Sequence, residues 1–456
     1  MPRLLLITYS FPPREQPGAI RPGGLAKHLA EFGWDVVVFT PQLPAGAQPP
    51  VQVIETAYED VLAKWKSRLG MDPGKSVHEQ LKLRTPSQPN SGALHTKILS
   101  YARCFLSFPD EARGWIPFAT RELEKLRAAG DIDAILTTSP PVSTHLIGKR
   151  AQRLLNRPWV ADFRDLWAEQ YLWGPHLVMQ PMHRLLEKRT LRLADALVTV
   201  SEPWAQRLRE HHPTKPVYNI SNGFDPDDFR DVRVPLSKKF SITHAGYLYE
   251  GKRDPTTLLQ VLSELIAERA VQASDLQVRF YGHPEAWVSH LVERYGLQDV
   301  VELSGVIPRR EVLQREAESQ VLLLLGWADP RETGQHTGKL FEYFGAGRPI
   351  LAVNGTRGVL TETLAETKAG IHVFDKEQLR GWLLKAYHEF KRVGAVPYQP
   401  DQRAIARYTH REMARRFSEV LQSTLERSRG GERLRSQAEE GVPQNFGGPL
   451  EENVQA

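Results

Sequence analysis

The sequence has almost no cysteine and no long apolar run, and both absences limit what the protein does. A single cysteine, Cys104, among 456 residues excludes an intrachain disulfide and a cysteine-rich metal site, and makes a reducing cytosol the natural compartment. The longest apolar run, 321–325, is far shorter than the roughly 18 residues that span a bilayer. The apolar stretch 4–7 is too short for a signal peptide, and no small-residue cleavage site follows it. We therefore expect a cytoplasmic protein without a membrane-spanning helix.

A third absence concerns the loop after the first predicted strand, 4–9. This loop lacks the Gly-x-Gly-x-x-Gly fingerprint with which dehydrogenases bind a dinucleotide, which argues against that class of enzyme. Prolines stand in its place, followed by Gly18.

Strand and helix patterns alternate along both halves of the chain. The first half predicts strands at 4–9, 35–40, 133–137, 159–163 and 196–200, with helices at about 22–32, 116–129, 142–155, 180–193 and 203–211. The second half predicts strands at 240–246, 276–282, 300–303, 321–326, 350–353 and 370–374, with helices between them. Such alternation predicts an α/β protein with two doubly wound, Rossmann-like domains.

The segment 61–109 interrupts this alternation and carries the basic excess of the chain. It holds eight basic side chains against two acidic ones, whereas the whole chain has a net charge of only +5, for which we expect no nucleic-acid partner. Within it an apolar stripe recurs at helical spacing: Leu94, Ile98, Tyr101, Phe105 and Phe108. One interpretation is a helix packed on its own domain. The other is an element that docks on an anionic membrane surface, with Lys97 and Arg103 beside the stripe.

The most informative stretch is 333–349. Gly334 and Gly338 suit a loop whose backbone comes close to a ligand, and the residues after Gly338 predict a short helix. The N-terminus of such a helix suits a diphosphate. Lys339 and Glu342 share a helix face, so one can reach a phosphate while the other accepts both hydroxyls of a ribose. The alternative is an ordinary helix-to-strand corner.

The order of residues in this stretch is more specific than its glycines. It runs Gly338-Lys339-Leu340-Phe341-Glu342-Tyr343, then Gly347 and Pro349. This order resembles the nucleotide-sugar site of GT-B glycosyltransferases, in the large retaining group of family 4-like, "group 1" enzymes. The resemblance implies that Glu342 binds the nucleotide ribose. It also leads us to expect a glutamate eight positions earlier, in contact with the donor sugar, where this chain has Gly334. Glu332 is a candidate substitute.

The resemblance extends over residues 1–425, apart from the insertion 61–109. It assigns donor binding to Gly18, Lys252, Arg253, Val306, Ile307, Gly338, Lys339, Leu340 and Glu342. Lys252 and Arg253 hold the diphosphate in this assignment, and 306–307 seat the base through backbone groups. Arg164 and Asp165 follow a predicted strand, where doubly wound folds bind ligands, and are the candidate catalytic residues. The alternative for this pair is a salt bridge that orders the loop.

The same resemblance implies a division of the chain. It gives an N-terminal acceptor domain at 1–216 with the insertion, a linker at 217–239, a nucleotide-sugar-binding domain at 240–402, a helix at 403–427 that crosses back, and a disordered tail at 428–456.

The function implied is transfer of a hexosyl group from a nucleoside diphosphate to a glycan or lipid-linked acceptor, with retention, in polysaccharide or glycolipid synthesis at the inner face of the membrane. We expect no cofactor and no metal, because the triplets 131–133 and 225–227, which have the order Asp-x-Asp, suit turns better than a metal site. Two alternatives stay open. One is a nucleotide-sugar epimerase of the same fold, and the other is a non-catalytic nucleotide-binding scaffold, which Gly334 motivates.

Overall fold

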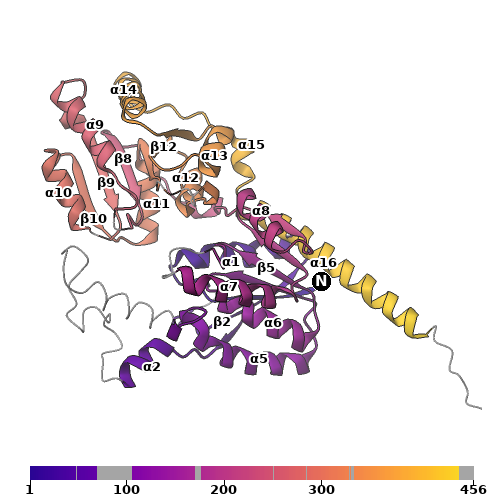
Figure 1. The fold of residues 1–456 in the computed structure, drawn as a ribbon. Coiled ribbons are helices and arrows are strands. Elements are labelled where there is room, and N and C mark those ends of the chain that lie inside the picture. The colour runs from indigo at the N-terminus through magenta and orange to yellow at the C-terminus, as the bar shows by residue number, and fades with distance from the viewer. Residues whose placement is uncertain are drawn as a thin grey trace, which may run out of the picture.

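The structure is a computed structural model that describes residues 1–47, 49–68, 105–169, 176–249, 251–283, 285–327, 329 and 333–440. The chain forms two α/β domains joined by a linker and by a return of the C-terminal helix, as Figure 1 shows. No helix in the described ranges is long and apolar enough to cross a membrane.

The N-terminal domain is built on a parallel sheet of seven strands. They are β1 (Arg3–Thr8), β2 (Asp35–Pro41), β3 (Gln52–Thr56), β4 (Ala134–Ser139), β5 (Trp159–Phe163), β6 (Ala196–Thr199) and β7 (Val217–Asn219), in the order β3-β2-β1-β4-β5-β6-β7. The sequence predicted most of these strands but missed β3, a half-buried edge strand with polar residues at both ends. The predicted linker 217–239 begins too early, because β7 pairs with β6 and so belongs to this sheet. The chain winds one way from β1 to β3 and then the other way from β4, so β1 and β4 flank a topological switch point.

Helices cover both faces of this sheet. They are α1 (Pro17–His28), η1 (Leu29–Phe32), α2 (Val61–Arg68), η2 (Glu111–Trp115), α5 (Ile116–Ala129), α6 (Ser143–Leu155), α7 (His176–Leu191) and α8 (Glu202–His211). Side chains of β1 alternate between the faces: Leu5 and Ile7 pack in a core with α5 and α6, whereas Leu4 and Leu6 pack with α1 on the other side. This double burial explains the continuous apolar run of the strand.

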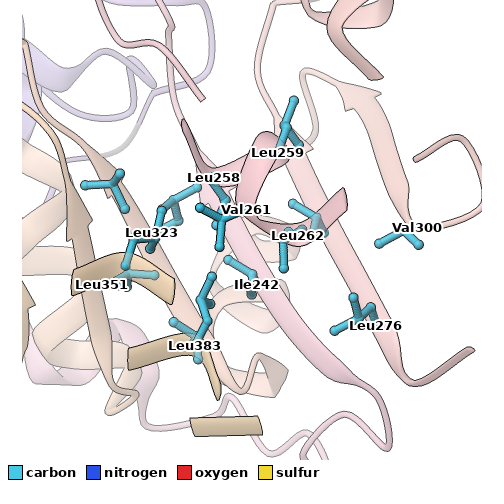
Figure 2. Close-up of a cluster of buried hydrophobic side chains, with 14 of the residues drawn as sticks. Ile242, Leu258, Leu259, Val261, Leu262, Leu276, Val300, Leu323, Leu351 and Leu383 are labelled. Atoms are coloured by element: carbon cyan, nitrogen blue, oxygen red, sulfur yellow. The ribbon is translucent and has the colours of Figure 1, made fainter. Parts of the chain in front are cut away.

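The C-terminal domain repeats this plan with six parallel strands. They are β8 (Phe240–Ala245), β9 (Leu276–Tyr281), β10 (Val301–Gly305), β11 (Val321–Leu325), β12 (Ile350–Val353) and β13 (Gly370–Val373), in the order β10-β9-β8-β11-β12-β13. The helices are α9 (Thr256–Ala267), η5 (Ala273–Asp275), α10 (Ala286–Arg294), α11 (Arg309–Glu318), α12 (Gly338–Ala346), α13 (Val359–Thr367) and α14 (Lys376–Val393). Figure 2 shows the core in which Leu323 of β11 meets Leu258 of α9 and Leu383 of α14. Leu322 and Leu324 point the other way, against α12.

The linker contains the short helix η4 (Pro226–Phe229), and two helices end the described chain, α15 (Gln402–Ala406) and α16 (His410–Glu440). Helix α16 lies along α1 on the N-terminal domain (Figure 1), where Phe417 is buried beside Leu25. The sequence predicted one helix at about 403–427, whereas the structure has two, and the second continues to Glu440 across Gly430 and Gly431. The predicted disordered tail therefore overlaps α16 over 428–440, and 441–456 lie outside the described residues.

The insertion 61–109 falls mostly outside the described residues, among them Leu94, Ile98 and Tyr101 of the predicted stripe. The other two members of the stripe differ from each other. Phe105 is 47% exposed, whereas the ring of Phe108 lies 4.8 Å from that of His183 on α7. The described end of the insertion thus packs partly on its own domain.

Candidate functional site

A cavity of about 660 Å³ lies between the two domains, at the carboxyl ends of β1, β4 and β5. This is the switch point of the N-terminal sheet, where open α/β sheets bind ligands. The N-terminal domain contributes, among others, Tyr9, Ser10, Gly18, Arg21, Tyr58, Asp110, Arg164, Asp165 and Trp204, and the C-terminal domain contributes Gln335, His336, Gly338 and Phe341. Four of the predicted site residues therefore line one cavity: Gly18, Arg164, Asp165 and Gly338.

Arg164 ties together the loops that follow β1 and β4. Its guanidinium donates to the backbone carbonyls of Ser139 at 3.0 Å, Pro140 at 2.6 Å and Gly18 at 2.7 Å. Burial lowers the pKa of this guanidinium because it removes water from the charged group. The three carbonyls replace that water as hydrogen-bond acceptors. Arg164 thus shapes the cavity wall, and Asp165 follows it on the same wall.

The carbonyl of Gly18 is available to Arg164 because of Pro22. The sequence predicted a helix from about residue 22, but α1 begins at Pro17, which places Pro22 inside the helix. Proline has no backbone N–H, so it makes no hydrogen bond to the carbonyl four residues earlier, which is that of Gly18. A Cβ at residue 18 would lie 3.2 Å from Nη1 of Arg164, so glycine permits this close approach.

Sequence reasoning missed a buried ion pair beside the cavity. Arg21 donates two hydrogen bonds to Asp162, at 2.9 and 2.8 Å, and both side chains are almost fully buried. Arg21 also donates to the carbonyls of Ile220 and Ser221 and so fixes the chain that leaves β7. The only signal in the sequence was an aspartate within the apolar strand 159–163, which does not identify a partner 141 residues away.

Helix α12 points its N-terminus at the cavity. It begins at Gly338 after the extended residue Thr337, and the sequence predicted both the helix and its start. The free N–H groups and positive dipole end there favour an anion. Leu340, a predicted donor contact, has its side chain in the core and its N–H bonded to the carbonyl of Thr337 at 3.1 Å. Its role in the structure is to pack α12 onto the sheet.

Glu342 lies in a buried cluster of charges outside the cavity lining. Its Oε2 accepts from Nη1 of Arg309 at 2.7 Å, and its Oε1 accepts from Lys339. Burial alone would raise the pKa of Glu342, but the cations Lys339 and Arg309 hold it at about 2. Lys339 also lies 3.3 Å from Oε1 of Glu316, a fully buried carboxyl whose pKa is raised by burial and by Glu342. The predicted pair 339 and 342 is therefore in direct contact.

Lys252 and Arg253 rest on aromatic rings at the end of β8. Nζ of Lys252 lies 4.5 Å from the ring centre of Trp327, and the guanidinium of Arg253 lies 4.8 Å from that of Tyr249. The ring of His244 lies between this loop and α12. Burial lowers its pKa to about 4, and the charges of Arg253 in the loop and Lys339 on α12 also lower it.

The predicted base site follows β10. Gly305 has a positive φ of 69°, as the turn there requires, and the next two residues begin the loop that leads to α11. Val306 is 68% exposed and Ile307 is half-buried, so the backbone of this loop is accessible to a ligand.

The structure explains why residue 334 is a glycine. A Cβ at this position would lie 2.5 Å from Cδ1 and 2.6 Å from Nε1 of Trp204, which comes from α8 of the N-terminal domain. A glutamate does not fit there while the domains are arranged in this way. Glu332, the candidate substitute, lies outside the described residues.

Comparison with known proteins gives matches to one sequence family and to several solved structures. Residues 19–223 match the family described as "Glycosyl transferase 4-like domain". HepE of Anabaena, solved in complex with UDP and glucose, aligns over 93% of this chain and 100% of its own with a TM-score of 0.59 and 14% identity. WaaG, a glycosyltransferase involved in lipopolysaccharide biosynthesis, aligns over 93% and 98% with a TM-score of 0.52 and 14% identity.

The N-terminal domain of trehalose-6-phosphate phosphatase from Candida albicans aligns over 93% of this chain and 97% of its own, with a TM-score of 0.62 and 12% identity. A search of curated proteins found no match to the sequence. At these sequence identities the structural similarity shows the fold alone. It confirms the predicted fold class, two Rossmann-like α/β domains of the GT-B type.

Proposed function

We propose that this protein transfers a sugar from a nucleoside diphosphate to a glycan or lipid-linked acceptor, a proposal supported by the match of residues 19–223 to the glycosyl transferase 4-like domain and by the GT-B fold. In that reaction the bond between the sugar carbon and the diphosphate oxygen breaks. The acceptor hydroxyl oxygen bonds to the same carbon, and its proton passes to the leaving diphosphate. The observation that carries the proposal is the cavity between the domains, with the N-terminus of α12 on one wall and Arg164 and Asp165 on the other.

The leaving diphosphate gains negative charge as its bond breaks, and the groups to stabilise it lie near the carboxyl end of β8. The proposal gives this role to Lys252, Arg253 and Lys339 together with the N-terminus of α12, without a metal or cofactor. Moving a cation off an exposed aromatic ring costs about 0.5–1 kcal/mol. Each hydrogen bond to a charged phosphate returns about 1.5–3 kcal/mol. By these magnitudes, Lys252 and Arg253 leave the aromatic rings when a diphosphate binds.

On the other wall, the proposal divides the work between two neighbours. Arg164 positions the loops by its three bonds to carbonyls, and Asp165 contacts the reacting groups. Hexosyl transfer with retention of configuration is part of the same proposal. The solved complexes of HepE with UDP and with UDP-glucose make these two molecules the first probes.

We also propose that the protein docks reversibly on the inner face of the membrane through 61–109. The excess of basic side chains in that segment supports the proposal, and so does a neighbouring surface. This surface, the α6–α7 cationic face, consists of Lys149, Arg150, Arg153, Arg189 and Arg192. Burial and the other four cations lower the pKa of Lys149, and none of the five is paired with a carboxylate within the described ranges. Phe108, near the end of the insertion, packs against His183 of α7, the helix that also carries Arg189.

Calorimetry with UDP and UDP-glucose, followed by an assay of released nucleoside diphosphate with and without acceptor glycans, tests the central proposal. Binding with acceptor-dependent release is the expected result. Conversion of the donor to an epimeric nucleotide sugar without any acceptor, and without net release of nucleoside diphosphate, would favour an epimerase. Tight binding without turnover on any acceptor would favour a scaffold. Absence of binding across a panel of nucleotide sugars would overturn the proposal.

A further inference from the structure

We propose that Arg309 is a positioning residue that holds Glu342 ready for the donor and ties it to the interdomain linker. The inference rests on the proposed function, because it concerns the same donor site. It starts from a geometric fact: one guanidinium reaches two carboxylates that belong to different parts of the chain. Nη1 of Arg309 lies 2.7 Å from Oε2 of Glu342 on α12, and Nη2 lies 2.9 Å from Oδ2 of Asp228 in η4.

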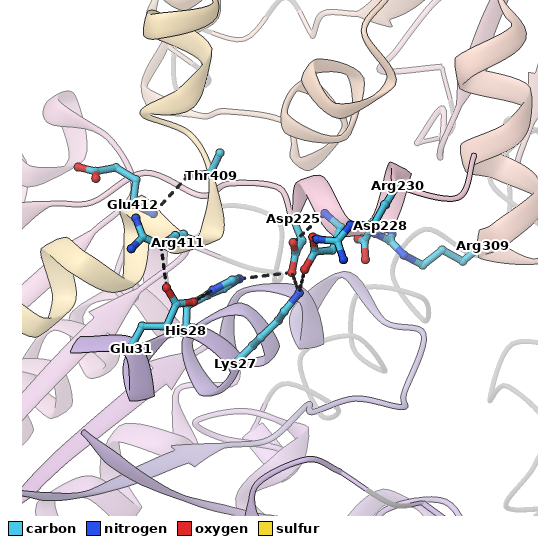
Figure 3. Close-up of polar contacts among 11 residues, drawn as sticks. Lys27, His28, Glu31, Asp225, Asp228, Arg230, Arg309, Thr409, Arg411 and Glu412 are labelled. Atoms are coloured by element: carbon cyan, nitrogen blue, oxygen red, sulfur yellow. Dashed lines mark hydrogen bonds and ion pairs between the residues drawn. The ribbon is translucent and has the colours of Figure 1, made fainter. Parts of the chain in front are cut away.

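The linker end of this bridge is itself fixed to the N-terminal domain. Lys27 of α1 contacts Asp225 at 2.7 Å and Asp227 at 2.6 Å, and these residues flank or belong to the same short helix as Asp228. Figure 3 shows Lys27, Asp225, Asp228 and Arg309 in succession from α1 to α11. A displacement of α1 relative to the C-terminal domain therefore acts on η4, and through Asp228 on Arg309.

The donor end of the bridge is a carboxylate with two cations and spare acceptor capacity. A carboxylate offers about four acceptor positions, of which Arg309 and Lys339 use one on each oxygen of Glu342. Glu316, whose raised pKa favours the protonated form, also interacts with Glu342, and the acceptor capacity that remains suits a ribose hydroxyl. The planar guanidinium of Arg309 contacts Glu342 with one nitrogen and Asp228 with the other, so it ties the position of Oε2 to the linker, which a point charge on a flexible stem does less well.

Among the residues that the structure describes, removal of Arg309 leaves Lys339 as the cation in contact with Glu342. The carboxylate then turns toward Lys339 and holds that ammonium more tightly, so it orients less well to a ribose and releases Lys339 less readily to a diphosphate. Both effects weaken nucleotide binding. The pKa of Arg309, which burial lowers but which Glu342 and Asp228 raise overall, fits a cation held firmly by both partners.

The experiment measures UDP affinity by calorimetry for Arg309→Ala, Arg309→Lys and Asp228→Asn. Coupling between sites typically changes affinity about 5- to 150-fold, and we expect about tenfold weaker binding for Arg309→Ala, partial rescue by lysine and a smaller loss for Asp228→Asn. Arg230→Ala is the matched control, because Arg230 pairs with Asp227 in the same linker turn. This control should bind UDP as the wild type does.

A double-mutant cycle separates positioning from a general effect on the fold. If Arg309 acts through Glu342, then Arg309→Ala adds almost nothing to the loss already caused by Glu342→Ala. Loss of UDP affinity should also exceed loss of affinity for dUDP, which lacks one ribose hydroxyl. Wild-type affinity in Arg309→Ala, or full additivity in the cycle, overturns the inference and leaves the proposed function intact. Absence of UDP binding, and of binding to other nucleotides, by the wild type overturns both.

Discussion

Replacing Glu342 with alanine should destabilise the protein even when no donor is present. The sequence alone predicted a ribose contact, whose loss would barely change the stability of the free protein. The structure instead places this carboxylate between Lys339 and Arg309, in a site where it is 9% exposed. An ionised group that is buried with two cations contributes to the free energy of unfolding, and its removal leaves those cations with fewer partners.

The size of the effect follows from the pKa of Glu342. Its value of about 2 lies below the ordinary 4.5, and each unit corresponds to about 1.36 kcal/mol, which gives an upper figure of about 3 kcal/mol. Glu342→Ala does not lose the whole of this stabilisation. In the variant Glu316 still pairs with Lys339, and the repulsion between Glu316 and the carboxylate of Glu342 is gone. We expect a net loss of about 2 kcal/mol, which lowers the Tm of a domain of this size by roughly 4–8 °C.

The dependence on pH has a definite sign. A carboxyl whose folded pKa is depressed stabilises the protein fully above its unfolded value of 4.5, and the contribution disappears as the pH falls through the folded value of about 2. The Tm difference between wild type and Glu342→Ala should therefore be constant from about pH 6 to 8 and shrink below about pH 4.5.

Differential scanning calorimetry of the unliganded proteins measures both quantities, with Glu316→Gln as the control. Burial and Glu342 favour the protonated form of Glu316, so an amide is a close substitute and the Tm should change less than in Glu342→Ala. If Glu342→Ala melts with the wild type at pH 7, the charge cluster does not stabilise the fold and the reasoning from burial is refuted.

Three further predictions concern other parts of the site and the surface. Arg253→Ala should lower transferase turnover strongly and Arg253→Lys should restore only part of it, because the guanidinium fork suits a diphosphate; full activity in the alanine variant would place the phosphate contact elsewhere. Arg21→Ala leaves Asp162 buried without its partner and should lower the free energy of unfolding, measured in urea, by about 3–5 kcal/mol, and a loss below about 1 kcal/mol would contradict this. Co-sedimentation should show binding to anionic but not zwitterionic vesicles, weakening as salt rises, and reversal of Lys97 and Arg103 to glutamate should abolish it while UDP binding persists; wild-type protein left in the supernatant at low salt would exclude docking.

The strands and the order of elements were predictable because burial on both faces leaves a local mark. Every strand of the C-terminal sheet was predicted within a few residues, most clearly β11 and β12, which are short apolar runs that are buried throughout. The start of α1 was mispredicted for an equally local reason. A proline is common in the first turn of a helix, and the chain has two in this region, of which Pro17 begins α1 and Pro22 lies inside it.

The contacts that build the site were harder to predict, because they join residues far apart in the chain. The sequence placed Glu342 and Lys339 on one helix face, which spacing alone decides. It gave no sign that Arg309 would take the other oxygen of Glu342, or that Arg21 would meet Asp162. Such pairs depend on how two elements dock, and a single sequence carries no record of that.

The contact between Gly334 and Trp204 constrains how these two positions evolve. The two residues belong to different domains, and the indole fills the space that a side chain at 334 would need. A mutation that gives residue 334 a side chain is therefore tolerated only after residue 204 has become smaller, because the opposite order places the new side chain against the indole. Lineages descended from a common ancestor of this protein should show the two positions varying together, with a bulky aromatic residue at 204 wherever 334 is glycine.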